Sequence, residues 1–444
     1  MIEVKIMVNI EGKLRAFSKD ERERLLREVA NATSVGYSIA DKVRRFCSFH
    51  RSNITSVARS RVGANSNYLT RWMVEILLSA HNKFSDNSDV PIDAAYLSAL
   101  LFLLDSTPSL SNRRSDVIKL VDGLTEQLEA STKDTDSGLL NDGNQFAYQN
   151  WDDEAKKVGT VIIFCPNPYS LYTSLVMHLC LAIDIPIVGV VSRKFTFDRM
   201  VFELKRDGFA RLVKKIFRKL ILRTDENSDK SAESLKKLHD VVVGVSPNVN
   251  NTCRLHGIPI LEVNEFADSL GWLDEQAPDA AIFTGGGMIS QSILDTFSQG
   301  VLNVHMGILP KYKGMDVVQA PILEGDSVGL TGHVMAAELD AGPIVQKFKI
   351  STLGYTSLGS LRNSLSAVMP ILAIDSLLGM FSGRLNTLDQ QPVGRQYYMM
   401  HPLLIKVTNN VLLNQCESVG PLDKNIVSSN ITTLIEYSKD KRSN

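Results

Sequence analysis

An amide, an imidazole and a carboxylate stand within one stretch of this 444-residue chain, between positions 303 and 340. Asn303 and His305 are two residues apart after a short apolar run, and residues i and i+2 of a strand point to the same face. Asp340 follows in a second turn, which Gly342-Pro343 marks. An amide can donate to a developing oxyanion, an imidazole can move a proton, and a carboxylate can orient the imidazole. The spacing predicts this chemistry if the fold brings the three groups together.

Apolar runs after residue 157 predict the sheet that would carry these groups. Residues 158–165 and 186–192 are two such runs, separated by a helix-like segment at 170–183. Runs of this kind are typical of parallel strands buried on both faces, joined by a right-handed connection. Further strands are predicted at residues 241–245, 257–261, 278–283, 328–335 and 344–350. We therefore expect an α/β fold with a Rossmann-like, mostly parallel sheet between residues 158 and 350.

Two loops at strand ends indicate what this sheet would bind. The turn Cys165–Pro168 has no G-x-G-x-x-G pattern, which excludes the usual dinucleotide-binding loop. After the strand at 278–283, Gly285, Gly286 and Gly287 form a run that would let a flat ligand approach the backbone. Ligands of open α/β sheets bind at the carboxyl ends of the strands. The alternative interpretation is an ordinary glycine-rich turn.

These motifs resemble those of the 10-formyltetrahydrofolate-dependent formyltransferases. Asn303-x-His305, Leu309-Pro310 and Gly314 match the first family motif, and Asp340-x-Gly342 matches the second at the family spacing. The likeness covers about residues 157–400 and implies the formyltransferase fold and a primary amine as formyl acceptor. It implies that Asn303 and His305 donate to the oxyanion and that Asp340 orients His305, favours its protonated form and places a water for proton relay. No metal is implied.

The same resemblance implies where the formyl donor, 10-formyltetrahydrofolate, would bind. Its pterin ring would lie against the end of one strand, the glycine run and the backbone of the later turn. These residues are Phe283, Gly285, Gly286, Gly287, Met288, Ile289 and Leu339.

The acceptor is less well defined. Pro166-Asn167-Pro168 replaces the phosphate loop of the family's purine branch, which argues against glycinamide ribonucleotide. The sequence given continues for about 40 residues after Pro402, fewer than the C-terminal domain of the branch that formylates initiator methionyl-tRNA. We expect the amine of a small metabolite, with an amino-sugar as the leading candidate. Two alternatives stay open: a formyltetrahydrofolate hydrolase, and a folate-sensing regulatory or binding protein with a basic N-terminal region.

Composition predicts three regions. Residues 1–150 have helical patterns at 18–32, 38–48, 67–82 and 92–105 and form a mainly helical domain of unknown role. Residues 131–157 are rich in Ser, Thr, Asp, Gly and Asn, which predicts a linker. Residues 157–350 would be the formyltransferase-like catalytic domain, and 351–444 a C-terminal helical extension and tail. The basic stretch 41–71 is interpreted as a solvated or docking face rather than a helix-turn-helix.

The overall composition bounds the partners. The net charge is −1, with 44% apolar and 22% charged residues, so no global field attracts nucleic acid or membranes. The five cysteines are scattered without a C-x-x-C pair, which favours a reducing compartment over disulfides or zinc. The first residues do not form a signal peptide, and we expect a cytoplasmic enzyme without a membrane or nucleic-acid partner. Its oligomeric state, including a homo-oligomer, stays open.

Overall fold

In the computed structural model the chain forms two compact units, Met1–Gln127 with Tyr398–Leu404, and Leu128–Tyr397 with Ile405–Asn444. The structure describes residues 97–98, 101, 114–131, 146–194, 230–243, 248–314, 317–391, 395–397, 400–419 and 429–437. In the first unit Leu97 and Leu101 are helical and buried. Helix α6 spans Arg114–Ser131, and all but its last residues belong to this unit. The helices predicted at 18–32, 38–48 and 67–82 and the basic stretch 41–71 lie outside the described residues. The predicted domain boundary at residue 150 stays a prediction.

The second unit is built on a seven-stranded sheet with the order β3-β2-β1-β4-β5-β7-β8. The strands are β1 Val161–Cys165, β2 Ile187–Arg193, β3 Ile260–Val263, β4 Ala280–Phe283, β5 Val301–His305, β7 Val328–Val334 and β8 Ile344–Ile350. β3, β2, β1, β4 and β5 pair in parallel, and β7 and β8 add antiparallel pairs. All five residues of β1 are buried, which explains its unbroken apolar run. The predicted mostly parallel α/β sheet is confirmed.

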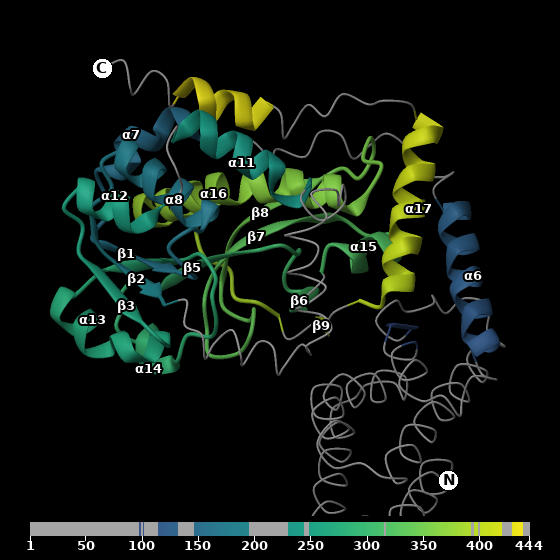
Figure 1. Ribbon diagram of the computed structural model, residues 1–444, viewed down its shortest axis with the longest axis horizontal. Helices are drawn as coiled ribbons and strands as arrows, with labels where there is room; N and C mark the ends of the chain where they lie inside the picture. Colours follow the sequence, from purple (N-terminus) through teal and green to yellow (C-terminus); the bar gives the residue numbers. More distant parts are fainter. Residues whose placement is uncertain are drawn as a thin grey trace, which may run out of the picture. The chain divides into compact units, whose positions relative to one another are not determined.

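Helices cover both faces of this sheet (Figure 1). α8 (Leu171–Ala182), α11 (Lys230–Val242) and α16 (Leu358–Ser382) lie on one side, and α13 (Leu270–Gln276) and α14 (Gln291–Leu294) on the other. On the second side Ile162 and Phe164 of β1 pack with Phe266 and Phe297 in an apolar core. The remaining labelled helical elements are η4 Tyr148–Asn150, α7 Trp151–Ala155, α12 Val249–Leu255, η5 Phe266–Ser269, α15 Gln319–Leu323 and α17 Pro402–Val419.

α16 is the one described helix long and apolar enough to cross a membrane, with a mean hydropathy of 1.7 over its most apolar window. It packs against β5, β7 and β8 and against α8 and α11, and 72% of that window is buried within the protein. The apolar side chains of α16 therefore belong to the core of this unit.

The strand predicted at residues 241–245 is wrong for residues 241–243, because α11 continues to Val242 and a turn follows it; residues 244 and 245 lie outside the described residues. Leu235, Leu238 and Val242 are buried at helical spacing, while Val241 is 45% exposed. Packing of this stripe against α8 and α16 overrides the strand preference of a β-branched run.

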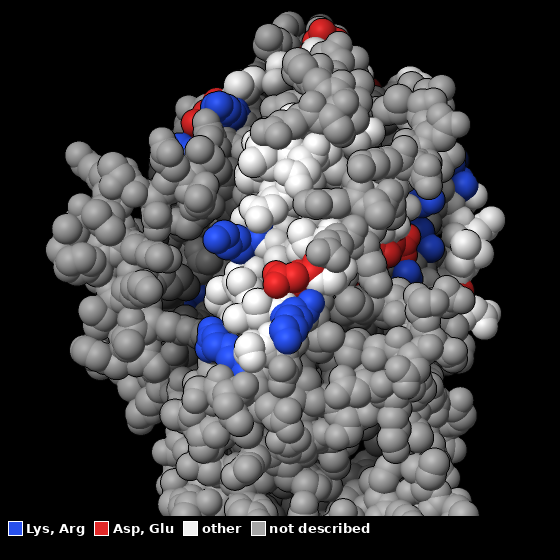
Figure 2. All heavy atoms as spheres, turned by 90° about the vertical axis from the view of Figure 1, so that its right-hand side faces the viewer, with Lys and Arg blue, Asp and Glu red and all other residues white. Residues whose placement is uncertain are grey.

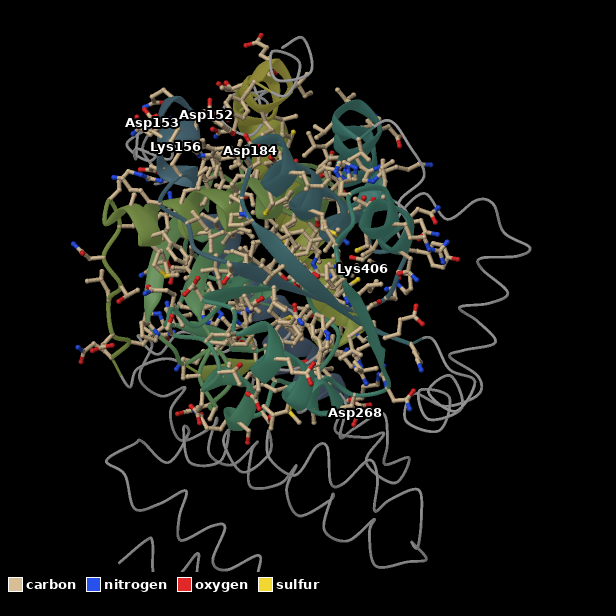
Figure 3. The ribbon with its side chains drawn as sticks, turned by 90° about the vertical axis from the view of Figure 1, so that its left-hand side faces the viewer. Asp152, Asp153, Lys156, Asp184, Asp268 and Lys406 are labelled. Atoms are coloured by element: carbon tan, nitrogen blue, oxygen red, sulfur yellow. The ribbon has the colours of Figure 1, made fainter. Side chains whose placement is uncertain are left out.

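The predicted linker at 131–157 is wrong for residues 146–155. Trp151 is fully buried, and its indole Nε1 donates to Asp375 Oδ1 of α16 at 2.9 Å. Arg384 bridges Glu154 at 2.7 Å and Asp375 at 3.0 Å. Of the polar residues that suggested a linker, Asp152 and Asp153 lie on the outer face of α7, where they reach the surface beside Lys156 (Figure 3).

Charge on the described surface is mixed in sign. Lys and Arg side chains have Asp and Glu beside them on the face drawn in Figure 2. This pattern agrees with the net charge of −1. The described part of this face gives no basic stripe on which a nucleic-acid interface could be argued.

Candidate active site

Two neighbouring antiparallel strands place the predicted amide beside a histidine. β5 and β7 pair with Asn303 opposite His333 and with His305 opposite Thr331. Directly opposed residues of a strand pair present their side chains to the same face, as do residues i and i+2. One face of this pair therefore carries Asn303, His305, Thr331 and His333.

His305 is held between a carbonyl and a carboxylate. Its Nε2 lies 2.8 Å from the Tyr312 carbonyl oxygen, and its Nδ1 lies 3.6 Å from Asp340 Oδ2. A carbonyl oxygen can only accept, so Nε2 carries a hydrogen. Nδ1 is therefore the ring atom that can take up or release a proton, and it faces the carboxylate. The side chains of His305 and Asp340 are both 8% exposed, which strengthens their electrostatic interaction.

The turn that carries Asp340 is fixed on several sides. Asp340 Oδ2 accepts from the Gly314 N–H at 2.8 Å, and Gln390 Nε2 donates to the carbonyls of Asp340 and Gly342 at 3.0 and 2.6 Å. Asp340 has φ +51°, a left-handed conformation that aspartate tolerates better than most residues. The β7–β8 hairpin thus delivers the carboxylate to His305.

His333 determines the direction of the Asn303 amide. His333 Nδ1 lies 3.2 Å from the Val334 carbonyl oxygen and therefore carries the ring hydrogen. Burial lowers the pKa of His333 to about 4, partly opposed by Asp340, so the ring is neutral near pH 7 and Nε2 keeps a lone pair. That lone pair accepts from Asn303 Nδ2 at 3.2 Å. One amide hydrogen is thereby used, and the second stays available to a ligand.

The structure brings Asn303, His305 and Asp340 together, with His333 Nε2 also 3.8 Å from Asp340 Oδ1. Their catalytic role stays a prediction. His333 lies on the strand predicted at 328–335, and the sequence left open whether it supports the site or is only a residue of the sheet. Its contact with Asn303 depends on the register of the β5–β7 pair. The sequence around position 333, a glycine followed by a histidine, is only a weak indication of that register.

The predicted donor-binding residues lie at the same edge of the sheet. Phe283 of β4 pairs with Asn303 of β5, so the glycine loop begins beside the amide. Phe283 and Ile289 are 7% and 8% exposed and belong to the apolar core, whereas Met288 and Leu339 are 90% and 52% exposed. Gly285, Gly286 and Gly287 all have positive φ. A ligand would therefore contact the backbone of this loop more than the side chains of Phe283 or Ile289.

Among the described residues no group of three or more His, Cys, Asp or Glu side chains is arranged to hold a metal ion. The fold and the site define an open α/β domain with an Asn–His–Asp centre at the carboxyl edge of its sheet. Residues 264–377, which contain this centre and the glycine loop, match the family described as formyl transferase. This part of the chain is therefore similar to the formyl transferase family.

Similar curated proteins are methionyl-tRNA formyltransferases. The protein from Borrelia garinii is 35% identical over 97 residues, which are 22% of this chain and 31% of that protein. The protein from Akkermansia muciniphila is 28% identical over 156 residues, 34% of this chain and 50% of that protein. The chain thus spans 31% to 50% of these relatives' length.

Similar solved structures include two formyltransferases. Phosphoribosylglycinamide formyltransferase from Bacillus halodurans has 14% identity and a TM-score of 0.35, over 51% of this chain and 96% of that one. A sugar N-formyltransferase from a Shewanella species has 12% identity and a TM-score of 0.36, over 57% and 88%.

Proposed function

We propose that this protein transfers a formyl group from 10-formyltetrahydrofolate to a primary amine. The observation that supports this most is the convergence of Asn303, His305 and Asp340 beside a glycine loop at the carboxyl edge of the sheet. The family match of residues 264–377 covers both parts.

Open space beside the glycine loop supports a flat folate ring there. An added Cβ at Gly285 would meet no atom within 4 Å, so the loop has open space on that side. Phe283 and Ile289, which flank the loop in the chain, belong to the apolar core. The bound donor would supply a formyl group on its N10, next to the Asn303 amide.

The chain's own residues would handle charge and protons. When the amine attacks the formyl carbon, negative charge develops on the formyl oxygen. The free Asn303 amide hydrogen can donate to that oxygen, and a protonated His305 can donate to it through Nδ1, because its Nε2 is occupied by the Tyr312 carbonyl. Asp340, 3.6 Å from Nδ1, would orient the ring and hold a water that carries the amine proton away. Each oxyanion donor of this kind is worth about 10²–10³ in kcat.

We propose the amine of a small metabolite as acceptor, with an amino-sugar as leading candidate. The Pro166–Pro168 turn supports an acceptor without a phosphate anchored at that loop. Two of its residues lack an N–H, and the N–H of Ser170 donates to the Asn167 carbonyl at 3.2 Å. The names of the sequence relatives make initiator methionyl-tRNA the acceptor to test against this proposal.

The test is tetrahydrofolate formation from 10-formyltetrahydrofolate in parallel reactions. One reaction has no amine, a second series has small amines including sugar nucleotides with a primary amino group, and a third has initiator methionyl-tRNA. We expect turnover with a small amine and a loss of at least about 10² in kcat for His305→Ala. Formate release without amine would instead identify a hydrolase, and turnover with tRNA alone would overturn the small-amine acceptor. Binding of the donor without turnover in any reaction would favour a sensing protein.

A further inference from the structure

Arg193, at the end of β2, joins three segments at the carboxyl edge of the sheet. Its Nε donates to the Asn264 carbonyl at 3.1 Å, one terminal nitrogen pairs with Glu265, and the other donates to the Gly286 carbonyl. The guanidinium also lies 5.6 Å from the Phe266 ring centroid. The residue is 7% exposed. A cation is costly to bury unless its donors find partners, so these contacts form a specific site for the guanidinium.

The segment that accepts two of these contacts is also held in place without the arginine. The Asn264–Glu265 segment follows β3 and begins η5 with a reciprocal capping box, in which the Glu265 N–H donates to Asp268 Oδ2 at 3.0 Å. Asp268 stands at the surface, where it can keep this cap without help (Figure 3). The glycine loop has no comparable local support. Among the described residues, no hydrogen bond is made by the N–H groups of Gly285, Gly286 or Gly287.

The contact with Gly286 fixes the direction of one peptide. In a planar trans peptide the C=O of one residue and the N–H of the next point in opposite directions. Because the Gly286 carbonyl is turned inward to Arg193, the Gly287 N–H is turned outward. The backbone is also confined from two sides, since a Cβ at Gly286 would lie 2.6 Å from Pro166 Cα and one at Gly287 would lie 2.8 Å from a terminal nitrogen of Arg193.

We propose that Arg193 is a positioning residue for the folate site, which holds the Gly286–Gly287 peptide so that its N–H faces the donor's ring. The proposal rests on the proposed function of this site. Arginine is required because its planar fork reaches Asn264, Glu265 and Gly286 at once, whereas a lysine ammonium is a single point charge on a flexible stem.

The test is binding of 5-formyltetrahydrofolate, a stable analogue of the donor, by calorimetry. Arg193→Met keeps the length and the apolar contact with Phe266 but loses the fork, and we expect its dissociation constant to rise about tenfold, the loss of about one oriented hydrogen bond. In the enzyme assay KM for the donor should rise similarly while kcat at saturating donor stays close to wild type. Glu265→Gln, which keeps the Gly286 contact, is the matched control and should bind like wild type.

The outcomes separate this inference from the proposed function. A wild-type protein that does not bind the folate overturns the proposed function itself. A folded Arg193→Met variant that binds like wild type, beside a wild type that does bind, overturns the role of Arg193 alone. If Arg193→Met does not fold, Arg193→Lys decides, because it keeps a cation for Glu265 but cannot also hold Gly286. Unchanged affinity in that variant equally overturns the inference.

Discussion

Gly307→Ala should slow turnover by moving His305. A Cβ at this position would lie 2.8 Å from His305 Nε2, 2.8 Å from the Tyr312 carbonyl oxygen and 2.9 Å from Val317 Cγ2. Ordinary contacts begin near 3.4 Å, so the methyl is about 0.6 Å too close on each side. Tyr312 cannot yield easily, since it is fully buried and its hydroxyl donates to Glu324 and Asp326 at 3.2 and 3.0 Å. The imidazole must therefore move and lose its hydrogen bond.

A displacement approaching 1 Å at a catalytic group costs about 10²-fold, so we expect kcat to fall by about 10–100-fold. Overpacking should also lower the free energy of unfolding by about 1–3 kcal/mol. Steady-state kinetics at saturating substrates and urea denaturation measure the two effects. Nitrogen NMR of the histidine rings reports the lost hydrogen bond of His305 even when no amine substrate is known. Gly271→Ala in α13 is the control, because its Cβ would meet nothing within 4 Å. A folded Gly307→Ala enzyme with wild-type kcat would refute this placement of His305.

Three further changes test other parts of the structure. Asp340→Asn keeps an acceptor for the Gly314 N–H but removes the charge, so kcat should fall by at least about tenfold while folate affinity, measured by calorimetry, stays unchanged. His333 has a pKa of about 4 against an ordinary 6.5. As the pH falls, His333 is therefore protonated at a higher pH in the unfolded chain than in the folded protein. The free energy of unfolding should fall by up to about 3 kcal/mol between pH 6.5 and pH 4. Urea titrations in which His333→Gln shows the same dependence on pH would contradict this. Arg384→Leu leaves the buried Asp375 without its cation and should cost about 3–5 kcal/mol of unfolding free energy in urea, whereas Lys156→Ala at the surface should leave the midpoint unchanged.

Local rules were sufficient where one element decides the outcome. The period of two in a strand placed Asn303 and His305 on one face before any tertiary contact was known. The unbroken apolar run of β1 predicted a strand buried on both faces. Asn248 caps α12 by the same kind of local rule, since its side chain accepts from the Asn251 N–H at 3.2 Å. These features depend on neighbours in sequence, so the sequence contains them directly.

Tertiary packing decided the remaining features. Val242 ends a helix rather than forming a strand because α11 has α8 and α16 to pack against. Trp151 turns a polar stretch into a core element because Asp375, 224 positions away in the chain, accepts from its indole.

The site combines both kinds of information. The motif spacing identified Asn303, His305 and Asp340 by itself, since their types and order are written in the chain. The direction of the Asn303 amide was set by His333 through the β5–β7 register, and the free nitrogen of His305 was set by the Tyr312 carbonyl. Hydrogen-bond direction and burial arise only when distant segments meet, and for that physical reason the folded structure, and not the sequence, determined which atoms of the site are free to act.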